Sequence, residues 1–99
     1  MFINYTYKNT DQDDQLEDVA SKELSRLSHQ FEFITKATVL FEEIDADGKD
    51  KICKVTLASP GDPIEISETA NAFRHAIVAV AHKLMDILKE RNDAIEGEA

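Results

Sequence analysis

The sequence contains one cysteine, three glycines, two prolines and no tryptophan among its 99 residues. The single cysteine, Cys53, excludes an internal disulfide framework and a cysteine-rich zinc site, and it suits a reducing compartment. The glycines are too dispersed to form a phosphate-binding loop. No apolar run approaches the length of about 20 residues that spans a membrane, because the longest covers only Ala76–Ala81. The first residues lack the basic leader and apolar run of a signal peptide, so we expect an intracellular, cytoplasmic protein without membrane association.

Positive charge is also scarce, because 11 lysines and arginines stand against 20 aspartates and glutamates, which gives a formal net charge of −9. Such a chain is expected to be soluble and to repel nucleic acid unless its few cations gather on one face. Its length and its 42% of hydrophobic residues suit one domain with one core. We predict a single domain over residues 1–92 and an acidic, disordered tail over residues 93–99.

The hydrophobic pattern predicts two helices and four strands. Aromatic and β-branched residues alternate in Phe2–Tyr7, which predicts a strand. A sequence similar to a capping box at Thr10–Asp13, followed by apolar residues at helical spacing, predicts a helix over Asp11–Ser28. From Lys36 the apolar period becomes two, which predicts three further strands around Ala37–Phe41, Cys53–Leu57 and Ile64–Ile66.

The connections between these elements predict the architecture. Short turns at residues 45–48 and 60–63 join the last three strands, so these strands are expected to form an antiparallel meander. A second helix is predicted to start at an N-cap on Thr69 and to end near Asn92. A right-handed crossover places the first two strands parallel and both helices on one sheet face. The predicted fold is an α+β two-layer sandwich of order β-α-β-β-β-α, with a four-stranded sheet and one open face.

The first of these turns is similar to part of a calcium-binding loop. If Glu43 is the first ligand, Gly48 occupies the sixth position as an EF-hand requires, but Lys54 stands at the twelfth position in place of the bidentate glutamate. The flanking segments are also predicted strands rather than helices. The pattern therefore favours a solvated hairpin turn over a calcium site.

The remaining chemistry-bearing residues do not form a catalytic or metal-binding set. His75 and His82 lie about 10 Å apart along a helix, which is too far for two ligands of one metal. His29 lies near the end of the first helix, where an imidazole complements the helix dipole, and all three histidines are interpreted as surface residues. Cys53 is predicted to be a small buried thiol. We therefore expect no enzymatic activity, no metal and no cofactor.

The cations are concentrated on the outer faces of the two predicted helices. On the first helix, the basic residues and histidine at helical spacing are Lys22, Arg26 and His29. On the second helix, they are His75, His82, Lys83 and Lys89. The helix dipole favours cations in the C-terminal half of a helix whatever its function, and Asp18 and Asp86 interrupt the two stripes. Composition and spacing leave two readings open, an ordinary solvated surface and a nucleic-acid-binding surface.

The order of elements and several short segments resemble the ribosome hibernation-promoting factors, a family also called ribosome-associated inhibitors or sigma-54 modulation proteins. The resemblance runs from Ile3 to about Arg91. It rests on the short first strand, on the element order, and on Lys54–Leu57 leading into Ser59–Gly61. In the second helix it rests on an aromatic residue, an Ala-Ile pair and a stretch similar to the family's Lys-Leu-x-x-x-Leu pattern, which are Phe73, Ala76-Ile77 and Lys83–Lys89.

The resemblance implies a fold akin to double-stranded RNA-binding domains and a role as a non-enzymatic, ribosome-associated stress factor. Such a factor binds the small ribosomal subunit in the channel for mRNA and tRNA and inhibits translation. By matching position, the residues implied to contact ribosomal RNA are Lys22, Arg26, His82, Lys83, Lys89 and Arg91. The family's helices carry denser lysine and arginine than this acidic chain. The chain also ends soon after the second helix, as expected of a short family member without the additional dimerisation domain.

Two further interpretations stay open. An acidic relative that has lost RNA binding is expected to act as a protein–protein interaction module, with a basic partner or by weak self-association. Val78 and Met85 extend the apolar stripe of the second helix and offer a surface for that contact, unless they pack between the helices. A small enzyme needs a pocket on the open sheet face, where outward residues such as Thr38 and Lys54 bring no titratable cluster together.

Overall fold

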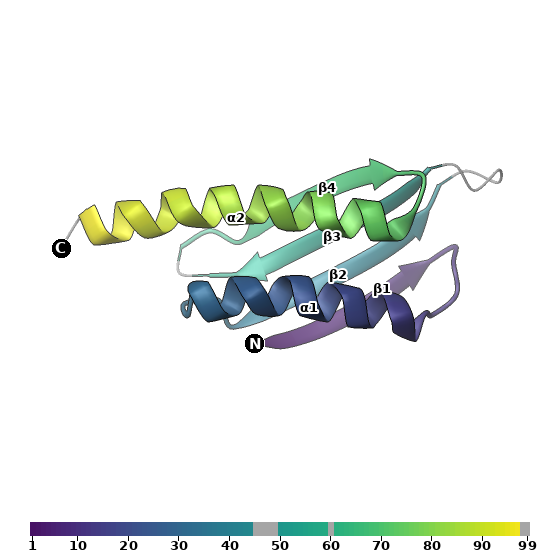
Figure 1. The fold of residues 1–99 in the computed structure, drawn as a ribbon, viewed down its shortest axis with the longest axis horizontal. Helices are drawn as coiled ribbons and strands as arrows, with labels where there is room; N and C mark the ends of the chain where they lie inside the picture. Colours follow the sequence, from purple (N-terminus) through teal and green to yellow (C-terminus); the bar gives the residue numbers. More distant parts are fainter. Residues whose placement is uncertain (45–49, 60, 98–99) are drawn as a thin grey trace.

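The fold consists of a four-stranded sheet and two helices in the predicted order (Figure 1). The structure is a computed structural model that describes residues 1–44, 50–59 and 61–97, with the side chains of the last helix described up to Arg91. The predicted turn at residues 45–48 lies outside the described residues, as does Pro60 of the second turn. The elements in chain order are β1 (Phe2–Lys8), α1 (Asp14–Gln30), β2 (Lys36–Glu43), β3 (Lys51–Ala58), β4 (Ile64–Ala70) and α2 (Phe73–Gly97).

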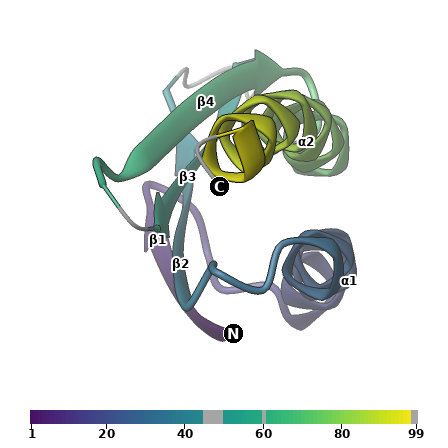
Figure 2. The same cartoon turned by 90° about the vertical axis from the view of Figure 1, so that its left-hand side faces the viewer.

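The strands lie in the order β1-β2-β3-β4, with β1 parallel to β2 and the other neighbours antiparallel. In the middle of the sheet, Val39 of β2 pairs with Tyr5 of β1 and with Val55 of β3. Figure 2 shows α1 and α2 on the same face of the sheet, and the opposite face carries neither helix. The predicted α+β two-layer sandwich, its parallel first pair and its antiparallel meander are therefore confirmed.

The core lies between the helices and the sheet because apolar side chains alternate along the strands. Val39 and Val55 are fully buried. Phe41 lies between Tyr7 and Phe73, with ring centroids 5.4 Å apart in both pairs. The helices contribute the fully buried side chains Leu24, Ile77, Val80, Leu84 and Leu88. Burial of one such side chain stabilises the folded state by about 1.5–3 kcal/mol, so this layer holds both helices in place on the sheet.

Helix α1 begins later than the sequence predicts. Its N-cap is Asp13, whose carboxylate accepts hydrogen bonds from the backbone N–H groups of Gln15 (2.9 Å) and Leu16 (3.4 Å). The predicted start at Asp11, with a cap at Thr10, is therefore wrong. The residues after β1 are needed to carry the chain from the sheet to the helix layer, and Asp13 has the extended backbone typical of an N-cap.

The start and the end of α2 also differ from the prediction. Thr69 is not an N-cap, because it lies in β4 and pairs with Ile52 of β3. The helix begins at Phe73, since sheet hydrogen bonds hold the preceding residues in the strand up to Ala70. The helix continues to Gly97, beyond the predicted end near Asn92. The disorder of the acidic residues 93–99 in solution stays a prediction, and residues 98 and 99 lie outside the described residues.

Candidate nucleic-acid interface

The outer surface of the helix layer is the candidate interface. Figure 1 shows α1 and α2 side by side, running in the same direction across the sheet, and Figure 2 shows the same pair nearly end-on. Because the helices run in the same direction, their C-terminal halves lie at the same end of the layer. The first turn of α1, with Asp14 and Glu17, lies at the other end. The acidic first turn of α1 therefore lies at the same end of the layer as Arg74 and His75 of α2, and away from His29 in the last turn of α1.

On α1 the expected division into an inner and an outer face is observed. Leu16, Ala20, Leu24 and Leu27 are buried against the sheet. The outer residues Lys22, Arg26 and His29 are exposed, as their spacing predicts. The Arg26 guanidinium lies 3.6 Å from the Glu23 carboxylate, and the Arg26 side chain is 73% exposed. Such a surface ion pair contributes little to stability, so it does not prevent the guanidinium from meeting a ligand.

On α2 the four predicted outer residues His75, His82, Lys83 and Lys89 are all exposed. Lys83 differs from the others because its ammonium forms an ion pair with Glu68 of β4. The Glu68 side chain is only 22% exposed and lies on the helix-facing side of its strand. A carboxylate in that position needs a cation, because a charge that is shielded from water and left unpaired is costly. Lys83 is therefore partly committed to the fold.

Arg91 has internal partners as well. Its guanidinium donates hydrogen bonds to the Ser59 hydroxyl (2.6 Å) and to the main-chain carbonyl of Asp62 (2.8 Å). These acceptors lie at the end of β3 and in the β3–β4 connection, so Arg91 ties that connection to α2. The structure thus places Arg91 at a half-buried position facing the sheet rather than on the stripe with Lys89.

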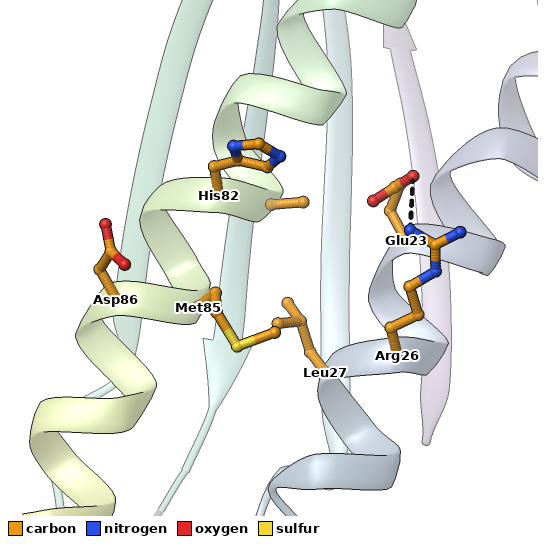
Figure 3. Close-up of a pocket in the computed structure, with 7 residues that line it drawn as sticks. Glu23, Arg26, Leu27, His82, Met85 and Asp86 are labelled. Carbon is orange, nitrogen blue, oxygen red and sulfur yellow. Dashed lines mark ion pairs between the residues drawn. The ribbon is translucent and has the colours of Figure 1, made fainter.

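A groove separates the outer surfaces of the two helices (Figure 3). It has a volume of about 310 Å³ and is lined by Glu23, Arg26 and Leu27 of α1 and by Ala81, His82, Met85 and Asp86 of α2. Met85 and Leu27 point toward one another between the helices, and they form an apolar floor with Ala81. Two residues expected from the sequence, Arg26 and His82, are brought to opposite sides of this groove.

Sequence reasoning missed the groove and the two carboxylates that hold site residues. The spacing of three residues between Glu23 and Arg26 on one helix was available as a signal for their ion pair. For Glu68, the signal was the alternation of the strand, because Ile64 and Ile66 place every second residue of this segment toward the helices. Of the two residues that extend the apolar stripe of the second helix, Met85 packs between the helices, whereas Val78 is exposed.

Other candidate sites are not assembled in the part of the chain that the structure describes. Within it, no group of three or more histidine, cysteine or acidic side chains could hold a metal ion. Most of the calcium-loop-like turn lies outside the described residues. Cys53 is buried as predicted, and burial raises the pKa of its thiol to about 12, so the reactive thiolate is not formed near neutral pH.

On the open sheet face, the described residues line two hollows of about 210 and 220 Å³, which are smaller than the groove between the helices. One is lined by Lys36, Thr38, Thr56, Ala58 and Pro63, and another by Thr6, Thr38, Leu40, Lys54 and Thr56. Lys54 forms an ion pair with Glu65 across two strands, at 3.1 Å. The Thr56 hydroxyl also donates a hydrogen bond to the Glu65 carboxylate, at 3.5 Å, so this carboxylate links Lys54 and Thr56 on the exposed surface of the sheet. Among the described helices, none combines the length and the apolar character needed to cross a membrane.

Solved structures of other proteins share this architecture, although no curated protein matches this sequence. A ribosomal subunit interface protein from Coxiella burnetii is similar in structure, with a TM-score of 0.83 and 22% identity, over 93% of this chain and 98% of that chain. The N-terminal domain of Protein Y from Thermus thermophilus has a TM-score of 0.78 and 22% identity, over 91% of this chain and 98% of that chain. At these identities the two structures establish the fold.

The family is established by the sequence itself. The model of the family described as "Sigma 54 modulation protein / S30EA ribosomal protein" matches residues 3–96, which is nearly the whole chain. The family consists of ribosome-associated modulation factors, which are not enzymes. This agrees with the lack of a catalytic set among the described residues and with the resemblance noted in the sequence. The chain belongs to the sigma 54 modulation protein / S30EA ribosomal protein family.

Proposed function

We propose that the chain binds the small ribosomal subunit in the channel that mRNA and tRNA occupy, and that it thereby inhibits translation on idle ribosomes. The proposal is supported mainly by the family match over residues 3–96. It agrees with the names of the similar structures, which include a ribosomal subunit interface protein. The cytoplasm, where ribosomes are found, is the compartment that this function implies.

The surface proposed to meet ribosomal RNA is the outer side of the helix layer, from the middle of α1 to its end and across the middle of α2. Lys22, Arg26, His82 and Lys89 are exposed there, and two of them flank the interhelical groove. Phosphate contacts supply most of the affinity that is independent of RNA sequence, so exposed cations are the groups that such binding requires. Lys83 contributes to this surface only when its ion pair with Glu68 opens. Arg91 supports the surface indirectly, because its hydrogen bonds hold the β3–β4 connection against α2.

The net charge of −9 makes the salt dependence of binding a quantitative test. If Lys22, Arg26 and Lys89 each neutralise one phosphate, a fourfold rise in salt weakens binding about 40-fold. Neutralising Lys22 and Lys89 by glutamine leaves one such contact, and the same rise in salt then weakens binding only about fourfold. The measurement is co-sedimentation of the purified protein with ribosomes from its own source, at about 50 and about 200 mM salt. Over this range the effect of salt on phosphate contacts is large.

A matched variant controls for the change in net charge. Lys36→Gln with Lys54→Gln removes the same charge from the open sheet face, which is opposite the helix layer. This control is expected to sediment with ribosomes as the wild type does. Equal losses in both double variants would place the contact outside the helix layer. No sedimentation of the wild type at low salt would refute the proposal and favour a protein-binding relative.

A further inference from the structure

The groove between α1 and α2 has a composition that a purely phosphate-binding surface does not need. Its floor consists of Leu27, Ala81 and Met85, and Glu23 projects into the same space beside the Arg26 guanidinium (Figure 3). A carboxylate repels phosphate, and an apolar floor offers phosphate neither a positive charge nor a hydrogen-bond donor. The groove therefore calls for a ligand that is apolar on its faces and carries both hydrogen-bond donors and acceptors at its edge.

We propose that this groove receives an unpaired nucleobase of the RNA that the helix layer contacts. An unstacked base has flat apolar faces, which fit over the Met85 thioether and the neighbouring aliphatic groups. Its exocyclic amino group can donate to the Glu23 carboxylate, and its ring or carbonyl acceptors can accept from Arg26 or His82. The inference rests on the proposed function, because the groove opens between the two basic stripes proposed to meet RNA.

Because the chain carries few positive charges, a base-binding site would add affinity that its phosphate contacts alone do not supply. Lys22, Arg26 and Lys89 supply a weak and strongly salt-dependent attraction, whereas a base stacked in the groove adds affinity that depends little on salt. Such an insertion also provides a register along the RNA, since proteins recognise RNA sequence mainly at unstacked bases. An apolar side chain of a protein partner is less well matched, because Glu23 and Arg26 at the groove offer polar groups that it leaves unused.

The test uses a substitution for which the two mechanisms predict opposite signs. Met85→Lys adds a cation to the basic surface, so it tightens ribosome binding if the surface acts through phosphates alone. If a base occupies the groove, the long charged side chain removes its apolar seat, and binding weakens at least about tenfold, equivalent to about 1.4 kcal/mol. Val78→Lys is the matched control, because Val78 lies on α2 outside the groove lining and is 38% exposed.

Binding to ribosomes is measured for both variants by co-sedimentation, together with their thermal unfolding. Met85→Leu, which keeps an apolar side chain of similar volume, is expected to bind as the wild type does. Loss of binding in Met85→Lys alone, with an unchanged melting temperature, supports the inference. Equal or tighter binding of Met85→Lys overturns it. Loss in both lysine variants also overturns it, because added bulk on this helix face would then explain the effect.

A second readout keeps the inference separate from the proposed function. The free protein is titrated with each of the four nucleoside monophosphates while the NMR signal of the methyl group of Ala81, which also lines the groove, is followed. A shift of this methyl signal, abolished in Met85→Lys and retained in Val78→Lys, supports a base site even if the protein does not sediment with ribosomes. If no shift is seen at about millimolar nucleotide, the inference is overturned, because such a site would need a dissociation constant of about 1 mM or lower.

Discussion

Arg91 distinguishes a residue that supports the interface from one that contacts RNA. Position in the family pattern implied that Arg91 contacts RNA, but its guanidinium donates to the Ser59 hydroxyl at 2.6 Å and to the Asp62 carbonyl at 2.8 Å. Arg91→Gln removes both bonds. Hydrogen bonds from a charged donor contribute about 1.5–3 kcal/mol each when well shielded. Because Arg91 is only half-buried, we expect a total loss of about 2 kcal/mol in the free energy of unfolding.

For a domain of this size, a loss of 1 kcal/mol lowers the melting temperature by about 4–8 °C, so Arg91→Gln is expected to lower it by about 8–16 °C. The assay is thermal and urea unfolding, followed by ribosome co-sedimentation at a temperature where the variant is fully folded. Under those conditions its salt dependence is expected to match that of the wild type. Lys89→Gln, on the exposed side of the same helix, should behave in the opposite way, with unchanged unfolding and a weaker salt dependence.

The result that refutes this reasoning is specific. If Arg91→Gln unfolds at the wild-type temperature and shows a reduced salt dependence of ribosome binding, Arg91 contacts RNA directly. The hydrogen bonds to Ser59 and Asp62 would then make no net contribution to stability.

Other predictions concern the core, the ionisable groups and Lys83. Leu84→Ala, at a fully buried position, should lower the free energy of unfolding by about 2–5 kcal/mol in urea titrations, and a loss below about 1 kcal/mol would contradict the core described here. Burial raises the pKa of the Cys53 thiol from 9.0 to about 12, so the folded state keeps a proton that the unfolded chain releases. Stability should therefore fall as pH rises from 9 toward 12, and Cys53→Ala should reduce that slope in urea midpoints measured across this range. Burial, together with the nearby carboxylates, raises the pKa of Tyr7 to about 12, so its ultraviolet titration should lie above the ordinary tyrosine pKa of 10.0. Glu68→Gln frees the Lys83 ammonium, so the slope of log binding constant against log salt should steepen by up to about one.

The outward and inward faces of the elements could be read from the sequence because they depend on local periodicity. Apolar residues at spacings of three and four place Leu24 and Leu84 toward the sheet, and the same spacing places Lys22 and Lys89 outward. The parallel pairing of β1 with β2 followed from the handedness of a strand–helix–strand connection. These features follow from chain geometry and need no knowledge of particular contacts.

The ends of the elements could not be read in the same way. The sequence around Thr69 suits an N-cap, yet Thr69 pairs with Ile52 in the sheet. Sheet hydrogen bonds to β3 prevail over the local capping preference, because they satisfy backbone groups along the whole strand. At the start of α1 the cap moves to Asp13, after the residues that the chain needs to leave β1.

The candidate site shows the same division between local pattern and distant contact. Periodicity alone identified the exposed cations of the helix layer, because whether a helical residue faces water depends on its spacing from the apolar stripe. The partners of those cations depend on residues far along the chain, such as Ser59 for Arg91 and Glu68 for Lys83. The groove exists because two helices, separated in sequence by three strands, pack side by side with Leu27 and Met85 between them. Which cations are available to a ligand was therefore set by tertiary packing, since hydrogen bonds and ion pairs form between whichever groups the fold brings within reach.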